Sequence, residues 1–195
     1  YRFQLFYWDY IVGLFGGIFF WGITLGSMGP GSHFLADVAD APLLSVGLAI
    51  LSGTLFNIAN LLLVAAIEIA GMAVAFPIGI GLALVVGALS SYLVDPRGNP
   101  LLLFGGILLV TVAIICDSLA FRARESQRRS NKRRGILLSL LCGSLMGSFY
   151  PLISKAMSLP DAPGPYAAGL FFVIGVALCS LPVNTLFMKR PIDGG

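Results

Sequence analysis

This chain has few charged residues. Asp, Glu, Lys and Arg make up 11% of its 195 residues, whereas hydrophobic residues make up 57%. Its mean hydropathy is +0.93. A soluble domain usually contains about 25% charged residues. The chain therefore lacks the polar side chains needed to cover a surface that faces water, which excludes an ordinary soluble domain.

Metal-ligating and nucleophilic side chains are also scarce. The chain has one histidine, His33, and three cysteines, which all lie within apolar runs. Such cysteines behave as small hydrophobic residues, and their spacing matches neither a disulfide framework nor a metal site. One histidine and scattered acids do not supply a catalytic triad. We therefore expect no metal, no cofactor and no enzymatic activity.

Long apolar runs are abundant. Windows of about 19 residues indicate six spans, at 11–28, 44–66, 71–92, 101–121, 135–157 and 166–188. Each run is close to the ~20 residues that a helix needs to cross a bilayer. None alternates apolar with polar residues as the strands of a membrane barrel do. The sequence predicts an all-α polytopic membrane protein with six transmembrane helices, and the tightest connection is expected at 68–71.

Basic residues are concentrated in one connection. The segment RARESQRRSNKRR, at 122–134, contains seven of the twelve Lys and Arg residues. If the spans alternate in direction, Arg2, Lys189 and Arg190 lie on the same side, which then carries ten of the twelve. Short basic loops remain cytoplasmic, so we expect a multi-pass protein of the cytoplasmic membrane whose first span runs outward. We expect the segment to set the topology and to contact anionic membrane lipids. Without aromatic residues for base stacking, it indicates no nucleic-acid partner.

A short pattern occurs twice, in opposite senses. Y-x-x-G-L-F begins at Tyr10 and again at Tyr166, five spans later, so the two copies enter the membrane from opposite faces. Inverted-topology repeats build many secondary transporters around a central site. On this interpretation residues 1–121 are a first repeat without its first helix, and 122–134 is the cytoplasmic connecting loop. Residues 135–195 then begin a second repeat that lacks its last three helices.

Several glycine-and-aromatic stretches resemble a known group of transporters. They are FYWDYIVG (6–13), the block from Gly71 to Tyr92, and GPYAAGLFFVIG (164–175). These are similar to the ureide permeases and to the glucose/ribose porter and rhamnose symporter branch of the drug/metabolite transporter superfamily. The resemblance covers nearly the whole chain and implies a ten-helix fold of five plus five. Plant ureide permeases have a long central loop with a nucleotide-binding-like motif, which 122–134 lacks, so the substrate stays open.

Two asparagines mark the middle of the second span. Asn57 and Asn60 lie one helical turn apart, and amides both donate and accept hydrogen bonds, which suits an uncharged solute. Alternatively they join neighbouring helices, at roughly 0.6 kcal/mol per hydrogen bond. We favour that alternative for Asn57 and leave both open for Asn60. The bend at Phe76 and Pro77, where proline removes a helix hydrogen bond, completes the predicted substrate-binding site.

Two acids are candidates for proton coupling. Glu68 lies between two isoleucines, and because a buried charge is costly in a membrane, it is expected to exchange a proton during transport. The alternative is that Glu68 marks the cytoplasmic turn and reaches headgroups or water. Asp117 is the second candidate, and its alternative is an ion pair with Arg122 at a helix end.

Two further patterns concern packing. The spacings of Gly13/Gly17 and Gly143/Gly147 predict close contact between helices. An interfacial belt is predicted for four aromatic residues near the start of the first span: Phe6, Tyr7, Trp8 and Tyr10.

The function predicted from these features is proton-coupled secondary transport of a small polar solute, such as a ureide, a nucleobase or a sugar. Two alternatives are a membrane subunit that transports nothing and an efflux carrier for amphipathic drugs or metabolites. A homodimer is left open. A membrane-embedded enzyme needs convergent acids, histidines or a nucleophile within the bilayer, and this stretch offers none.

Overall fold

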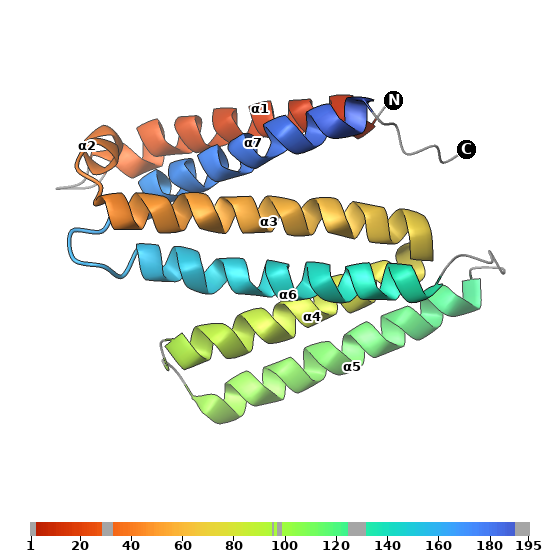
Figure 1. The fold of residues 1–195 in the computed structure, drawn as a ribbon. Coiled ribbons are helices and arrows are strands. Elements are labelled where there is room, and N and C mark those ends of the chain that lie inside the picture. Colours follow the sequence, from red (N-terminus) through yellow and green to blue (C-terminus); the bar gives the residue numbers. More distant parts are fainter. Residues whose placement is uncertain (1–2, 29–32, 95, 97–98, 125–131, 190–195) are drawn as a thin grey trace. The chain divides into compact units, whose positions relative to one another are not determined.

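A computed structural model describes residues 3–28, 33–94, 96, 99–124 and 132–189, and these residues contain helices and no strand (Figure 1). The helices are α1 (Phe3–Thr24), the 3-10 helix η1 (Leu25–Ser27), α2 (Phe34–Ala39), α3 (Leu43–Ala70), α4 (Met72–Val94), α5 (Pro100–Arg124), α6 (Lys132–Ala156) and α7 (Pro165–Lys189). Six of these helices are long and apolar enough to cross a membrane: α1, α3, α4, α5, α6 and α7. The prediction of six apolar spans is thereby confirmed.

The ends of the helices differ from the predicted spans in two places. α1 begins at Phe3 rather than near residue 11, so the aromatic residues ahead of the predicted span are helical. The six-residue helix α2 follows His33 and was not predicted. A window of ~19 residues averages out a helix this short.

Helix ends are set by residues with particular backbone requirements. Gly71 separates α3 from α4 with a φ of 83°, a left-handed conformation that glycine adopts without steric cost. Its N–H donates to the carbonyl of Ile67 at 2.8 Å, and its own carbonyl accepts from the N–H of Ala75 at 3.0 Å. A single residue therefore reverses the chain, which confirms the tight connection predicted at 68–71.

Residue contacts divide the chain into two compact units. Unit 1 comprises Tyr1–Asn57 with Leu152–Gly195, and unit 2 comprises Ile58–Pro151. Helix α3 contributes its first half to unit 1 and its second half to unit 2. This division differs from the predicted repeats, and the repeat boundaries stay a prediction.

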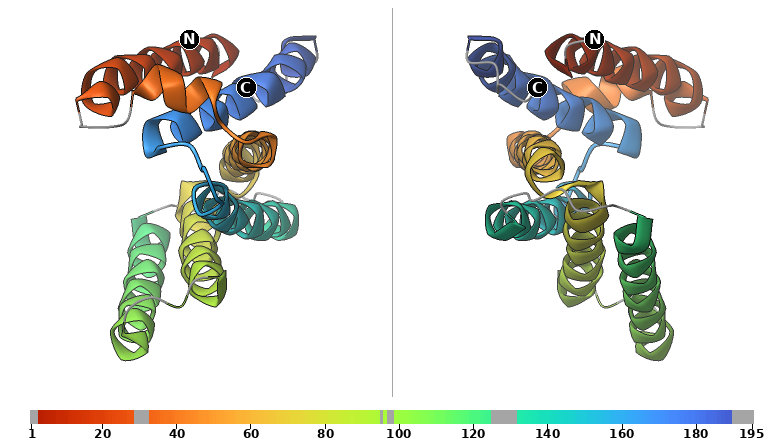
Figure 2. Two further views of the ribbon diagram at one scale, coloured as in Figure 1. Left: turned by 90° about the vertical axis from the view of Figure 1, so that its left-hand side faces the viewer. Right: turned by 90° about the vertical axis from the view of Figure 1, so that its right-hand side faces the viewer.

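In unit 1, α1 and α7 lie side by side with opposite directions (Figures 1 and 2). Gly26, after the end of α1, contacts Tyr166 at the start of α7, and Ile18 contacts Gly169 one turn further along. The residues that open the two Y-x-x-G-L-F copies, Tyr10 and Tyr166, therefore lie at opposite ends of this helix pair. The core beside the pair is formed by Phe34, Ala49, Ala156, Ala167, Leu170 and Phe171.

Backbone contact through glycine holds α7 against α3. A methyl group on Gly53 would overlap the carbonyl of Phe172, and one on Gly175 would overlap the carbonyl of Ile50. The hydroxyl of Thr54 also donates to the carbonyl of Gly175 at 3.4 Å. Lipid tails are as apolar as leucine, so membrane helices gain stability from such close approach rather than from hydrophobic burial alone.

Unit 2 uses glycines in the same way between α4 and α6. A methyl group on Gly143 would lie 2.6 Å from the carbonyl oxygen of Gly79, and one on Gly147 would lie 2.6 Å from Cβ of Val86. The close packing predicted for Gly143/Gly147 is confirmed. Around Gly13 and Gly17 no atom lies within 4 Å of the added methyl group, so among the described residues the same spacing on α1 has no packing partner.

Helix α5 packs along α4 and leaves most of its surface uncovered. Ile114 contacts Gly81 of α4, where a methyl group would lie 3.0 Å from the isoleucine side chain. Leu101 is 81% exposed and Leu109 is 72% exposed. Such an apolar surface is suited to contact with lipid.

Alanine substitutions should lower stability at a glycine that contacts another helix and leave it unchanged at a glycine with open space around it. We expect Gly53→Ala to destabilise the protein by about 1–3 kcal/mol, because its methyl group overlaps backbone that cannot rotate away. Gly13→Ala is the matched control. It should be neutral or stabilise the helix by up to ~1 kcal/mol, because alanine restricts the unfolded chain and meets no atom here. Unfolding of the purified protein in detergent measures both, and equal stability of the two variants would contradict the backbone contact.

Candidate functional site

A hydrogen-bonded polar cluster lies inside unit 1. Asn57 of α3 is fully buried, and its Oδ1 accepts a hydrogen bond from the hydroxyl of Tyr7 on α1. Its Nδ2 donates to Oγ of Ser180 on α7 at 3.0 Å. Ser180 in turn donates to the carbonyl of Val176 at 2.8 Å. One amide thus joins three membrane-length helices.

These bonds define what Asn57 can do. Both polar atoms of its amide take part in a hydrogen bond and the side chain is fully buried, so a solute could reach it only if the surrounding side chains moved. The arrangement suits the interhelical role that we favoured for this residue, and its predicted role in substrate binding stays a prediction.

The interpretation of Tyr7 as part of an interfacial belt is wrong. Its side chain is only 3% exposed, and its hydroxyl is bonded to Asn57. Position near a helix end suggested a contact with headgroups, but the partner is 50 residues away in the sequence. Nothing in the local pattern around Tyr7 reports that partner.

The other predicted substrate residues lie in unit 2 and are not gathered into one site. Asn60 is half-buried on α3, and Phe76 on α4 is 48% exposed. Pro77 is buried in the next position of α4. It lines a small cavity of about 310 Å³ between α4 and α5, beside Thr111 and Ile114. Among the described residues, neither Asn60 nor Phe76 lines that cavity.

The two candidate acids are exposed. Glu68 lies in the last turn of α3, and Asp117 lies in the C-terminal half of α5. The predicted partner of Asp117, the side chain of Arg122, falls outside the described residues. In the part of the chain that the structure describes, no three His, Cys, Asp or Glu side chains are grouped to hold a metal ion.

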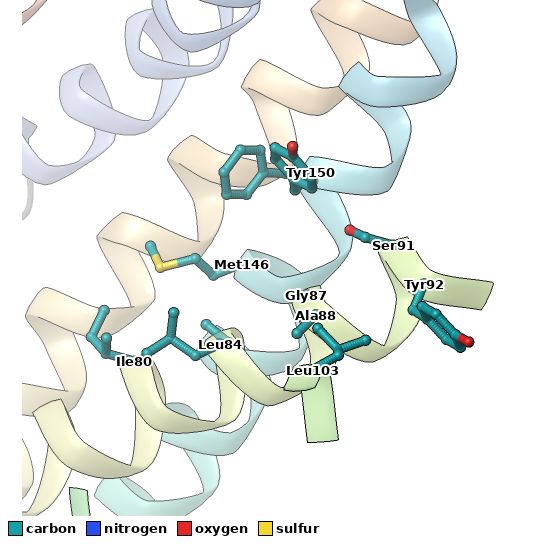
Figure 3. A pocket seen from close by; sticks show the side chains of 11 residues that line it. Ile80, Leu84, Gly87, Ala88, Ser91, Tyr92, Leu103, Met146 and Tyr150 are labelled. Carbon is teal, nitrogen blue, oxygen red and sulfur yellow. The ribbon is translucent and has the colours of Figure 1, made fainter. Parts of the chain in front are cut away.

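A larger cavity opens in unit 2 between α4, α5 and α6 (Figure 3). Its volume is about 530 Å³, within the range of roughly 300–1,000 Å³ that small-molecule sites occupy. Its lining residues are Ile80, Ala83, Leu84, Gly87, Ala88, Ser91, Tyr92, Leu103, Met146, Phe149 and Tyr150. None of these side chains carries a charge, so the cavity suits an uncharged molecule.

The two ends of this cavity differ in polarity. Ser91 and Tyr150 lie at one end, and Ile80, Leu84 and Met146 lie toward the other (Figure 3). Oγ of Ser91 is buried and has no hydrogen-bond partner among the described residues. No feature of the sequence distinguishes this serine from its neighbour Ser90. The hydroxyl of Ser90 donates to the carbonyl of Val86 in its own helix.

The same small residues that join α4 and α6 give the cavity its position. Gly143 and Gly147 let the two helices touch, and beyond Gly147 the larger side chains of Phe149 and Tyr150 face α4 across the cavity. Pro151 follows within α6 and cannot donate the helix hydrogen bond to the carbonyl of Gly147. That carbonyl oxygen lies 3.5 Å from the position of a methyl group on Gly87, a cavity-lining residue.

Comparison of the chain with protein-family models, with curated proteins and with solved structures found no match. The site therefore has to be interpreted from its own geometry.

A double-mutant cycle tests the polar cluster. We expect Asn57→Ala and Ser180→Ala to be coupled by about 0.6 kcal/mol and by no more than about 1.7 kcal/mol, the range measured for hydrogen bonds between membrane helices. Unfolding in detergent gives the coupling energy. Ser144→Ala serves as the control for Ser180→Ala, because the Ser144 hydroxyl bonds only to the carbonyl of Leu140 on its own helix. Additive effects of Asn57→Ala and Ser180→Ala would contradict the cluster.

Proposed function

We propose that this chain belongs to a secondary active transporter that moves a small polar organic solute across the cytoplasmic membrane, coupled to protons. The solute class is a ureide, a nucleobase or a sugar-like compound. The proposed architecture is a ten-helix inverted repeat of five plus five, of which this chain supplies six spanning helices.

The observation that carries the proposal is the cavity of about 530 Å³ among helices α4, α5 and α6. All three helices are long and apolar enough to span a membrane. Their cavity offers aromatic rings and hydroxyl groups without a charge, which is the chemistry that holds an uncharged polar solute. A membrane subunit that transports nothing has no need of such a cavity.

Unit 1 supports the proposal in a second way. Its helices α1 and α7 both contain the Y-x-x-G-L-F pattern, from Tyr10 within α1 and from Tyr166 at the start of α7, and they run in opposite directions. Inverted repeats place corresponding helices in this relation.

Proton coupling is assigned to the acids. In this proposal Glu68 binds a proton when the carrier faces one compartment and releases it in the other, with Asp117 as the second candidate. Because the net charge of the site changes with this proton, the energy of moving the loaded carrier depends on the proton gradient.

Efflux of amphipathic drugs or metabolites is the second candidate function. It is favoured by the apolar end of the cavity, where Ile80, Leu84 and Met146 lie. Transport of amphipathic cations would distinguish the two functions. A carrier for neutral solutes should not transport them, because no acidic side chain lines the cavity.

Transport itself is tested by solute uptake into liposomes that contain the purified full-length protein. We expect a proton gradient, acid outside, to drive accumulation of a ureide, nucleobase or sugar. Glu68→Gln should abolish accumulation above equilibrium and its dependence on pH, because glutamine resembles the protonated acid and cannot release a proton. Asp40→Asn, at an exposed position outside the spans, is the control. Full accumulation and unchanged pH dependence in Glu68→Gln would remove the coupling role.

Orientation is tested by cysteine labelling in intact cells. In a protein whose native cysteines are all replaced by alanine, we expect Ser158→Cys to react with a membrane-impermeant maleimide from outside. Met72→Cys, also exposed, should react only after the cells are permeabilised, because three spans, an odd number, lie between residues 72 and 158. Labelling of both positions from the same side would overturn the alternating topology.

A further inference from the structure

The first spanning helix, α1, contains a single acid, Asp9. We propose that Asp9 binds and releases a proton in the interior of the membrane, in addition to the exchange assigned to Glu68. The inference rests on the proposed transport function for the use of this proton, and it names a further residue that binds it.

Contacts of α1 with its longer neighbours give the height of Asp9 within unit 1. Tyr7, two residues earlier, bonds to Asn57 of α3. Asn57 lies near the middle of this 28-residue helix, about 21 Å from its end at Leu43 at a rise of 1.5 Å per residue. Although Asp9 is close to the start of its own helix, it is therefore level with the middle of α3.

A second contact, further along α1, gives the same height. Ile18 contacts Gly169 of α7, which runs in the opposite direction to α1 (Figure 1). The segment from Asp9 to Ile18 extends about 14 Å, and Gly169 lies about 6 Å from the end of α7 at Pro165. Asp9 is therefore about 20 Å from that end of a helix that is about 37 Å long.

This height places the carboxyl group of Asp9 within the hydrocarbon layer. The layer is about 30 Å thick, so wherever it is placed along the length of α7, Asp9 lies about 10 Å or more from either of its surfaces. Lysine and arginine reach water from such a depth through their long side chains, whereas aspartate is too short to do so. Asp9 is therefore an intramembrane acid.

Among the described residues, no base of unit 1 lies at this height. Helices α1, α2 and α3 contain no lysine or arginine, Lys189 ends α7, and Lys155 lies in the last turn of α6. A charged aspartate in a membrane is costly without a partner, and a proton is the counter-charge that remains. None of the other titratable groups on α1, α2, α3 and α7 supplies a positive charge: Tyr7, Tyr10, Asp37, Glu68, Tyr166 and Cys179.

Helix stability does not explain the position of Asp9 in α1. An acid stabilises the N-terminus of a helix through the helix dipole only in the first turn, and α1 has no acid there. Asp9 is also exposed. On the same face of α1, Gly13 and Gly16 have no atom within 4 Å of an added methyl group. The described helices therefore leave the carboxyl group open to a proton donor.

The proposed step is the exchange of one proton. The carboxylate of Asp9 accepts a proton from water that reaches this face of α1 from one side of the membrane. The neutral acid later loses the same proton to water from the other side, and no other bond changes. Between these events the neutral form avoids the cost of a charge within the membrane.

Modification by dicyclohexylcarbodiimide tests this site in the purified full-length protein in liposomes. The apolar reagent partitions into hydrocarbon and adds to a protonated carboxyl group, which leaves a stable N-acylurea. We expect mass spectrometry to locate this adduct on Asp9, with a yield that falls as the pH is raised. Asp40, exposed and outside the spans, is the internal control and should carry no adduct. The inference is overturned if Asp9 carries no adduct, or if the yield does not change with pH.

The variant Asp9→Asn tests the use of this proton. Asparagine resembles the neutral acid and cannot release a proton, so the variant should lose proton-driven accumulation of solute but keep solute exchange across the liposome membrane. Asp9→Glu restores the carboxyl group and should recover accumulation, and the melting temperature reports whether each variant is folded. Accumulation by Asp9→Asn equal to that of the unchanged protein would overturn its role in coupling. Chemical modification needs neither solute nor gradient, so a pH-dependent adduct on Asp9 in a protein that transports nothing contradicts the proposed function alone.

Discussion

The interior of a bilayer contains no water to hydrogen-bond the chain, and this constraint governs the whole structure. Each backbone N–H and carbonyl must find a partner within the protein, which is why the described residues form helices. The hydrophobic effect then offers little drive for one helix to pack on another. Glycine supplies the alternative, since Gly53, Gly175, Gly143 and Gly147 bring backbones into direct contact and gain dispersion energy where a side chain would have kept the helices apart.

Two buried polar side chains differ in whether they have a hydrogen-bond partner. Asn57 is fully buried, and each polar atom of its amide has a hydrogen-bond partner, Tyr7 or Ser180, so it joins three helices. The hydroxyl oxygen of Ser91 is also buried, but it has no hydrogen-bond partner among the described residues. The first arrangement stabilises a unit in one conformation. The second leaves one buried polar group unsatisfied, which costs about 1–3 kcal/mol.

Charged side chains and the cavity lie in different parts of the protein. The acids proposed to carry protons, Glu68 and Asp117, are exposed rather than buried in a helix contact, whereas the cavity lining is uncharged. A neutral solute would therefore enter the cavity without bringing a counter-charge into the membrane, and the proton would be carried elsewhere. Separate sites for solute and proton require a conformational change to link them, and the prolines within α4, α6 and α7 each leave a helix hydrogen bond unmade.

Local properties of the sequence determined the number of spans and the turn at Gly71, because hydropathy and backbone freedom depend only on neighbouring residues. They also gave the limits of most spans to within a few residues, but not the start of α1 at Phe3. Contacts between distant residues were not determined in this way. Gly13/Gly17 and Gly143/Gly147 have the same spacing, yet only the second pair meets another helix. Tyr7 was predicted to lie at the membrane interface and is buried against Asn57. The hydroxyl of Ser90 bonds to its own helix, whereas that of its neighbour Ser91 has no partner among the described residues. Such differences arise from which helix lies opposite each residue, and only the tertiary structure decided that.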